Sequence, residues 1–184
     1  MQNTLVIGYG NIDRQDDGVA WHVLAALARL FNQPVPDDPD ESFQFPVNLV
    51  DSTPANQNTQ ATRSIPNPAY HFSLQLLPEM AEMLAGIERV CFVDAHTGNI
   101  PEDVQFTNLQ AGYQRSPFTH HMTPETMLAF AQNLYGYRPQ AILVSIRGYE
   151  FGFDRRLSKR TAGLVGQAVE QIMEWLFGPG TVQV

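Results

Sequence analysis

The sequence contains a single cysteine, Cys91. A lone cysteine forms no internal disulfide and no cysteine cluster, so a disulfide-stapled domain and a cysteine-ligated metal centre are both excluded. Cys91 lies inside the apolar run Val90-Cys91-Phe92-Val93. We therefore expect it to be a buried packing residue.

Long hydrophobic runs are also missing. No apolar stretch approaches the roughly 20 residues that a membrane span requires. The first apolar run has no basic region ahead of it, and it meets Gly8-Tyr9-Gly10-Asn11 instead of a small-residue cleavage site. These features lead us to expect a cytoplasmic protein.

Basic residues are scarce, with 11 Lys and Arg against 19 Asp and Glu and a formal net charge of -8. A nucleic-acid groove or an anionic membrane surface needs concentrated Lys and Arg, so neither is expected as a partner. A protein or a cation fits better. The length of 184 residues and the 43% hydrophobic content suit one globular domain over residues 1–184.

Strands and helices are expected to alternate along the chain. Leu5-Val6-Ile7 is a buried strand that ends in a glycine turn, and an apolar stripe with helical spacing follows Asp17. The alternation predicts an α/β fold, a three-layer α/β/α sandwich around a mostly parallel, twisted sheet of about five strands. The later expected elements are a helix at 78–86, strands at 89–93, 104–106 and 141–146, a helix after Thr123-Pro124, and a closing helix at 162–176.

Residues 33–68 interrupt this pattern. They hold seven of the thirteen prolines and many Asn and Gln residues, which predicts a long loop or insertion. Two segments compete for the second sheet strand, residues 47–50 inside this stretch and residues 70–74 after it. The sequence does not rank them.

Three polar positions fall where neighbouring strands and helices meet. Asp17 follows the first strand, Asp94 ends the strand at 89–93, and His120 or His121 precedes a helix. Each has an ordinary alternative as a helix cap, a turn residue or a surface histidine. The carboxyl ends of parallel strands converge on one crevice, where two carboxylates and one imidazole would form an open three-ligand site. Such a donor set suits nickel or zinc.

The order of five short motifs along the chain is more informative about function than the spacing of the candidate ligands. They are Gly8-x-Gly10-Asn11, Asp16-Asp17-Gly18, Val93-Asp94-Ala95, Thr119-His120-His121 ahead of a helix, and Phe151-Gly152-Phe153 with Leu157-Ser158. In this order, on these elements, the chain resembles the hydrogenase maturation proteases over nearly its whole length outside residues 33–68.

The resemblance implies an endopeptidase that removes the C-terminal extension of a nickel-iron hydrogenase large-subunit precursor after nickel insertion. The family's metal-binding residues fall on Asp17, Asp94 and His121, and His121 is favoured over His120 by its spacing from the following helix. These three would serve as metal ligands and in catalysis. The nickel would come with the precursor and would not be held stably by the free protein. The metal could activate water, or it could position the substrate while Asp17 or Asp94 acts as the base.

Two motifs depart from the family pattern. An Asp-Gly-Gly-Thr-like loop usually follows the second strand, and neither Asp51-Ser52-Thr53 nor the segment around Phe72-Ser73 reproduces it. The proline expected after Ile146 is replaced by the segment that begins Arg147-Gly148. Substrate recognition is therefore expected to differ, and the client to be an unusual hydrogenase.

Three other functions compete with this interpretation. The first is a nickel-dependent chaperone or scaffold that binds the precursor without cleaving it. The second is a small nucleotide- or phosphate-binding enzyme that uses the turn from Gly8 to Asn11, although position 13 is Asp where the dinucleotide motif has its third glycine. The third is a zinc hydrolase, which no His-Glu-x-x-His segment supports.

Overall fold

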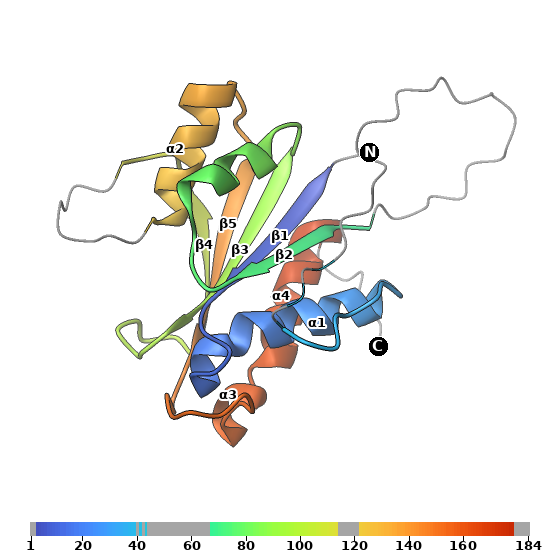
Figure 1. The fold of residues 1–184 in the computed structure, drawn as a ribbon, viewed down its shortest axis with the longest axis vertical. Helices are drawn as coiled ribbons and strands as arrows, with labels where there is room; N and C mark the ends of the chain where they lie inside the picture. The colour runs from blue at the N-terminus through green and yellow to red at the C-terminus, as the bar shows by residue number, and fades with distance from the viewer. Residues whose placement is uncertain (1–2, 40, 42, 44–66, 114–121, 179–184) are drawn as a thin grey trace, which may run out of the picture.

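The computed structural model describes residues 3–39, 41, 43, 67–113 and 122–178. These residues form a five-stranded sheet with the strand order β2-β1-β3-β5-β4 (Figure 1). Strands β1 to β3 and β5 are parallel, and β4 pairs antiparallel with β5 at one edge. The strands are β1 (Thr4–Tyr9), β2 (Ala69–Ser73), β3 (Arg89–His96), β4 (Val104–Leu109) and β5 (Gln140–Arg147).

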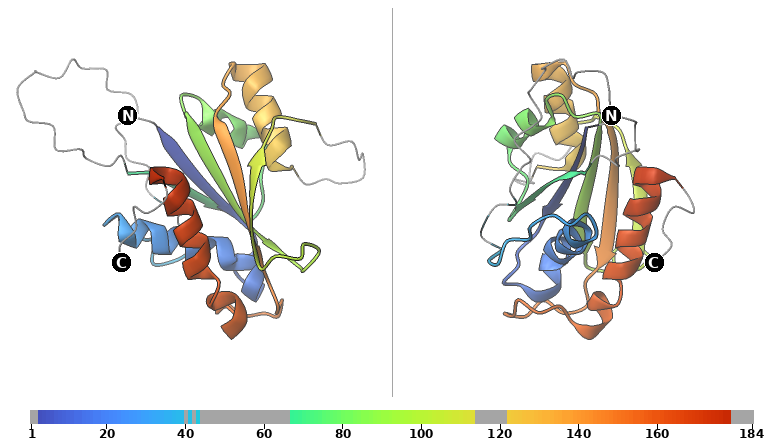
Figure 2. Two further views of the ribbon diagram at one scale, coloured as in Figure 1. Left: turned by 180° about the vertical axis from the view of Figure 1, so that it is seen from behind. Right: turned by 90° about the vertical axis from the view of Figure 1, so that its right-hand side faces the viewer.

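Helices cover both faces of the sheet (Figure 2). Helices α1 (Val19–Leu30) and α4 (Val165–Phe177) lie on one face, and α2 (Pro124–Tyr135) and the 3-10 helix η3 (Pro78–Leu84) lie on the other. Two short helices, η1 (Gln15–Gly18) and α3 (Lys159–Ala162), lead into α1 and α4. The arrangement confirms the expected three-layer α/β/α sandwich with a mostly parallel sheet. None of the helices in the described part of the chain is long and apolar enough to cross a bilayer.

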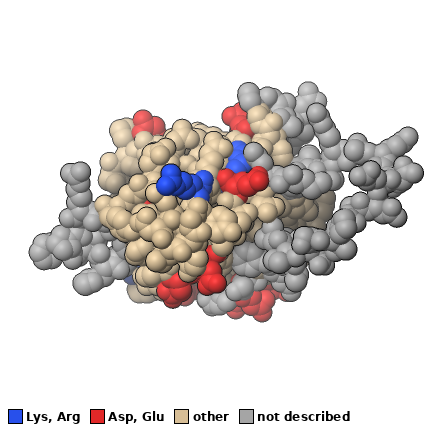
Figure 3. Space-filling view, turned by 90° about the horizontal axis from the view of Figure 1, so that it is seen from above, with Lys and Arg blue, Asp and Glu red and all other residues tan. Residues whose placement is uncertain are grey.

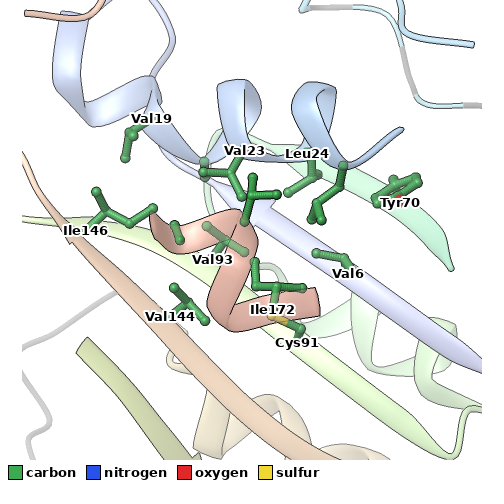
Figure 4. Close-up of a cluster of buried hydrophobic side chains, with 14 of the residues drawn as sticks. Val6, Val19, Val23, Leu24, Tyr70, Cys91, Val93, Val144, Ile146 and Ile172 are labelled. Carbon is green, nitrogen blue, oxygen red and sulfur yellow. The ribbon is translucent and has the colours of Figure 1, made fainter. Parts of the chain in front are cut away.

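Alternate residues of each strand belong to two separate hydrophobic cores, because successive side chains point to opposite faces of a sheet. Val6 and Val93 pack against Leu24 of α1 and Ile172 of α4 (Figure 4). The other face buries Leu5, Ile7, Val90 and Phe92 beneath η3 and α2. Each large apolar side chain that is fully buried contributes about 1.5–3 kcal/mol. Cys91 belongs to the first core and is fully buried with a free thiol, as expected.

The structure decides between the two candidates for the second strand. Ala69–Ser73 pairs with β1 as β2, which confirms the later candidate, residues 70–74. Residues 47–50 and most of the 33–68 stretch lie outside the described residues. The extra strand expected at 104–106 is present as β4 and extends to Leu109.

Two expected helices are present with differences in detail. The short helix expected at 78–86 is the 3-10 helix η3, which ends at Leu84, and Leu77 is more exposed than Met80 and Leu84, the two residues expected on the same side. So short a segment makes few of the hydrogen bonds that favour an α-helix. The closing helix is split, because the N–H of Leu164 bonds to Thr161 before α4 begins at Val165, and Ala162 is exposed.

The strand order creates one crevice at the carboxyl ends of the strands. From β1 the chain crosses to β2 on one side, whereas β3 lies on the other side of β1. Loops leaving β1 and β3 therefore diverge, and open α/β sheets bind ligands at such a switch point. Asp17 follows β1 and Asp94 lies near the end of β3, so both approach this position.

Arg89, at the start of β3, fastens the end of α4 to the sheet. Its guanidinium donates to the carbonyl of Leu176 at 3.0 Å and to that of Trp175, and it stacks on the Trp175 ring at 3.9 Å. We expect Arg89→Ala to lower the free energy of unfolding by about 2 kcal/mol, because helix-end carbonyls lose a charged donor. Urea unfolding measures this. Arg138→Ala, at an exposed site, is the control and should change stability by less than about 0.5 kcal/mol.

Candidate functional site

The loop after β1 folds back tightly on itself. Gly10 has φ +139°, and a β-carbon there would collide with the carbonyl oxygen of Asp17. A β-carbon on Gly18 would lie 2.7 Å from the backbone of Ile12. These close approaches are what the glycines at both positions permit. The backbone N–H of Asn11 donates to Oδ2 of Asp17 at 2.8 Å, which fixes that carboxylate beside the end of β1.

The neighbouring Asp16 has a different role. It is fully buried, and its carboxylate accepts five hydrogen bonds of 2.7–2.8 Å. The donors are the backbone N–H groups of Tyr149, Glu150 and Ser158 and the hydroxyls of Ser158 and Thr161. Burial alone would raise the pKa of Asp16, but these hydrogen bonds outweigh burial and lower it. Asp16 therefore joins the first loop to the segment after β5, and Asp17 is left to face the crevice.

Asp94 lies near the carboxyl end of β3, two strand positions above the buried Phe92. Burial and, to a smaller extent, the charge of Asp17 raise the pKa of its carboxyl to about 7, against the lowering effects of hydrogen bonds from Tyr9 and from the N–H of Ala95. The two aspartates follow adjacent parallel strands, β1 and β3, and the charge of Asp17 acts on Asp94. The structure therefore brings together two of the three residues that the sequence indicated.

Sequence reasoning missed Tyr9. Gly8 pairs with Val93 in the parallel register, so the next residues, Tyr9 and Asp94, lie side by side on neighbouring strands. Both also lie on the sheet face of the second core, since Ile7 and Phe92 two residues earlier belong to it. The Tyr9 hydroxyl is a hydrogen-bond partner of Asp94. The signal was present in the alternation of the two strands, but it required their register.

The histidine of the predicted site, His121, and its neighbour His120 lie outside the described residues. The helix start expected after them is confirmed: Thr123 caps α2 through Thr126 N–H, and Pro124 opens the helix. Within the described ranges no group of three His, Cys, Asp or Glu residues could hold a metal ion. His96, near Asp94 on β3, uses Nδ1 to accept the N–H of Gly98, so it closes the turn after the strand.

The glycine turn is poorly suited to a phosphate. The N–H of Asn11, which a phosphate would need as a donor, is already bound by Asp17, and Asp13 adds a further carboxylate nearby. A cavity of about 320 Å³ opens beside the turn, lined by residues 10–13, by Pro39 and by Phe72, Ser73 and Leu74 at the end of β2. A groove beside two carboxylates fits a cation or a polypeptide better than an anionic nucleotide.

Three solved structures share this architecture over nearly the whole length of both chains. Hydrogenase maturating endopeptidase HybD from E. coli has 16% sequence identity and a TM-score of 0.61, with 97% of this chain and 94% of that chain covered. The [NiFe] hydrogenase maturation protease HycI from Thermococcus kodakarensis has 15% identity and a TM-score of 0.60, covering 95% and 92%. Hydrogenase 2 maturation peptidase from a Thaumarchaeota archaeon has 16% identity and a TM-score of 0.55, covering 96% and 99%.

At this level of identity the likeness establishes a shared fold. No protein-family profile matches the sequence, and no curated protein matches it either. The fold of this chain is therefore that of the hydrogenase maturation proteases named above.

Asp16 and Asp17 should differ sharply in their effect on stability. An Asn at position 16 must turn an NH2 group toward N–H or O–H donors, so we expect Asp16→Asn to lower the free energy of unfolding by about 3 kcal/mol. Asp17→Asn is the matched control, with an expected loss below about 1 kcal/mol, because Asp17 accepts one backbone bond and is only partly buried. Equal losses in denaturant unfolding would contradict the assignment.

The pH dependence follows from the lowered pKa of Asp16. The unfolded carboxyl, with a pKa of about 3.9, takes up its proton before the folded one does. The stabilisation is therefore complete above the unfolded pKa and is lost as the pH falls through the folded pKa. The gap between the wild type and Asp16→Asn should stay constant at pH 5–7 and shrink below about pH 4.

Proposed function

We propose that the protein is an endopeptidase that removes the C-terminal extension of a nickel-iron hydrogenase large-subunit precursor after nickel has been inserted. Two findings support the proposal: the fold likeness to solved hydrogenase maturation endopeptidases, and the meeting of Asp17 and Asp94 at the switch point of the sheet. The proposal includes the cytoplasmic location expected from the sequence.

The observation that carries the proposal is the pair of carboxylates. Asp17 and Asp94 come from different elements, both are half-buried, and the charge of Asp17 acts on Asp94. Like charges held together in a partly buried site are unfavourable unless a cation or a proton offsets them. A divalent ion presented by a substrate would supply that compensation. Their oxygens, joined by one imidazole nitrogen, make a donor set that accepts nickel.

On this proposal His121 supplies the imidazole. It is the second residue before the Thr123 cap of α2, and α2 packs on the sheet face that also carries Tyr9 and Asp94. Two carboxylates and one histidine leave coordination positions open. The nickel remains part of the precursor, and docking places it between the three side chains with the scissile bond alongside.

The reaction is the hydrolysis of one peptide bond. Nickel bound between the precursor and the three ligands would polarise the scissile carbonyl and activate water, or it would position the substrate while Asp17 or Asp94 acts as the base. The water oxygen bonds to the carbonyl carbon, the carbon–nitrogen bond breaks, and a proton released by the water passes to the leaving amine. The cavity beside Asn11 and Phe72 takes the extended chain on one side of that bond. Its wall carries Phe72-Ser73-Leu74 in place of the Asp-Gly-Gly-Thr-like loop, so this part of the groove differs in chemistry.

The direct test is incubation with a nickel-loaded large-subunit precursor, read by mass spectrometry. We expect wild type to release a C-terminal peptide only when nickel is present. Asp17→Ala, Asp94→Ala and His121→Ala should each reduce the rate at least about a hundredfold, since each removes a ligand to the reacting centre. His120→Ala is the matched control and should retain activity within about threefold.

The outcomes separate the competing functions. An intact precursor that still binds wild type tightly would replace the endopeptidase with a nickel-dependent chaperone. Activity lost in His120→Ala and kept in His121→Ala would exchange the two histidines. Cleavage without nickel would refute the role of the metal.

Tyr9 is expected to act by positioning Asp94. Partners that orient a metal ligand typically change affinity or activity 10- to 100-fold when removed. We expect Tyr9→Phe to lower kcat about tenfold while KM changes less than about twofold, with an unchanged unfolding midpoint. Tyr135→Phe, an exposed tyrosine at the far end of α2, is the control. A fall in kcat that tracks a loss of stability would leave Tyr9 without a positioning role.

A further inference from the structure

An exposed aromatic side chain projects beside the site. Phe153 is 88% exposed, more than any other large hydrophobic residue in the described part of the chain. It lies in the segment between β5 and α3 that Asp16 fastens to the first loop. A single exposed hydrophobic side chain is common on protein surfaces, so the significance of Phe153 depends on how the loop around it is held and on the charges beside it.

The backbone around Phe153 is held firmly. Arg14 and Asp154 form a parallel β-bridge, the N–H of Gln15 donates to the carbonyl of Asp154 at 2.8 Å, and the N–H of Gly152 donates to Oε1 of Gln15 at 3.1 Å. Gln15 itself has φ +56°, a backbone conformation that is unfavourable for a residue with a side chain. The loop is therefore built to keep one shape, which reduces the entropy lost when a partner binds.

Basic residues gather at this end of a chain that is acidic overall. Of its eleven Lys and Arg residues, one is at position 14 and five lie between positions 147 and 160. These six are Arg14, Arg147, Arg155, Arg156, Lys159 and Arg160. Arg155 and Arg156 are paired with Asp13 and Asp154.

Arg147 both pairs with Asp103 and stands over the Tyr149 ring at 5.0 Å, whereas Arg14 and Arg160, among the described residues, lie on aromatic rings alone. The guanidinium of Arg14 stands over the Phe153 ring at 4.9 Å, and that of Arg160 stands over Tyr149 at 3.7 Å. Neither forms an ion pair with another described residue. At the opposite end of the sheet, where the parallel strands begin, the surface visible in Figure 3 is mostly uncharged.

We propose that Phe153 and Arg14, together called the aromatic tip below, bind the folded body of the hydrogenase large-subunit precursor. The surface of the precursor that they contact combines an apolar recess with at least one carboxylate. The inference rests on the proposed function. Gln15, which hydrogen-bonds to Gly152 and Asp154, is two residues from Asp17, so the tip adjoins the loop that a bound C-terminal tail would approach. Aromatic and arginine side chains fixed in one geometry are the groups that dominate protein interfaces.

The first test compares Phe153→Ala with Leu134→Ala in precursor cleavage. Leu134 is 68% exposed near the end of α2 remote from the site, so it is a matched exposed apolar residue. We expect Phe153→Ala to raise KM about tenfold and to leave kcat within about twofold, as for the loss of one interface anchor. Leu134→Ala should leave both constants unchanged.

The second test concerns charge. The KM of wild type should rise as sodium chloride is increased from 50 to about 300 mM, since the Debye length shortens and exposed attractions are screened. Arg14→Gln should raise KM at low salt and reduce this salt dependence. A KM unchanged in both Phe153→Ala and Arg14→Gln would overturn the proposal.

Direct binding of the intact precursor separates this inference from the proposed function. If wild type binds the precursor without cleaving it and Phe153→Ala weakens binding about tenfold, the docking surface stands and the endopeptidase fails. If wild type cleaves normally and Phe153→Ala does so with the same KM, the docking surface fails alone. If wild type neither binds nor cleaves, both are refuted. A wild-type dimer that Phe153→Ala converts to a monomer in light scattering would instead assign the tip to self-association.

Discussion

The buried carboxylate of Asp16 is the interaction on which the site depends. Its five hydrogen bonds tie the loop after β1 to residues 147–161, more than 130 positions later in the chain. A buried charge is costly unless every lone pair is satisfied, and here the hydrogen bonds that satisfy it also fix the relative position of two loops. That position determines where Asp17 faces the crevice and how the aromatic tip stands beside it.

The sheet supplies the remaining geometry. Because β1 and β3 are adjacent and parallel, the residues at their carboxyl ends share one level, and side-chain alternation sends Tyr9 and Asp94 to the same face. Burial and, to a smaller extent, the charge of Asp17 raise the pKa of Asp94, so a charged Asp94 at this end of the sheet costs free energy. The two apolar cores provide the stability that permits it.

Local patterns predicted what depends on local physics. The glycine turn, the apolar stripe of α1, the cap at Thr123 and the strand that ends near Asp94 could all be read from spacing and residue type. The division between Asp16 and Asp17 could not, because the partners of Asp16 are brought near only by the folded sheet. Tyr9 was missed from the sequence for the same reason, because its position beside Asp94 follows from the register of β1 and β3. The pattern predicted a short helix at η3 but not its 3-10 type, because periodicity alone does not separate an α-helix from a 3-10 helix over so few residues.

On the proposed function, Asp17, Asp94 and His121 fill only part of the coordination shell of nickel and the precursor fills the rest, so the free site holds the ion weakly. On the proposed function this weakness is useful, because a protease that captured nickel by itself would compete with its own substrate for the ion. Affinity must then come from protein surfaces that touch the precursor outside the metal. The loop that carries Phe153 suits that task, because Asp16 joins it to the loop that carries Asp17. A precursor that binds at the aromatic tip is therefore also positioned relative to Asp17. Selectivity for the client would then lie in the loops around the crevice, while the metal ligands report only whether nickel is present.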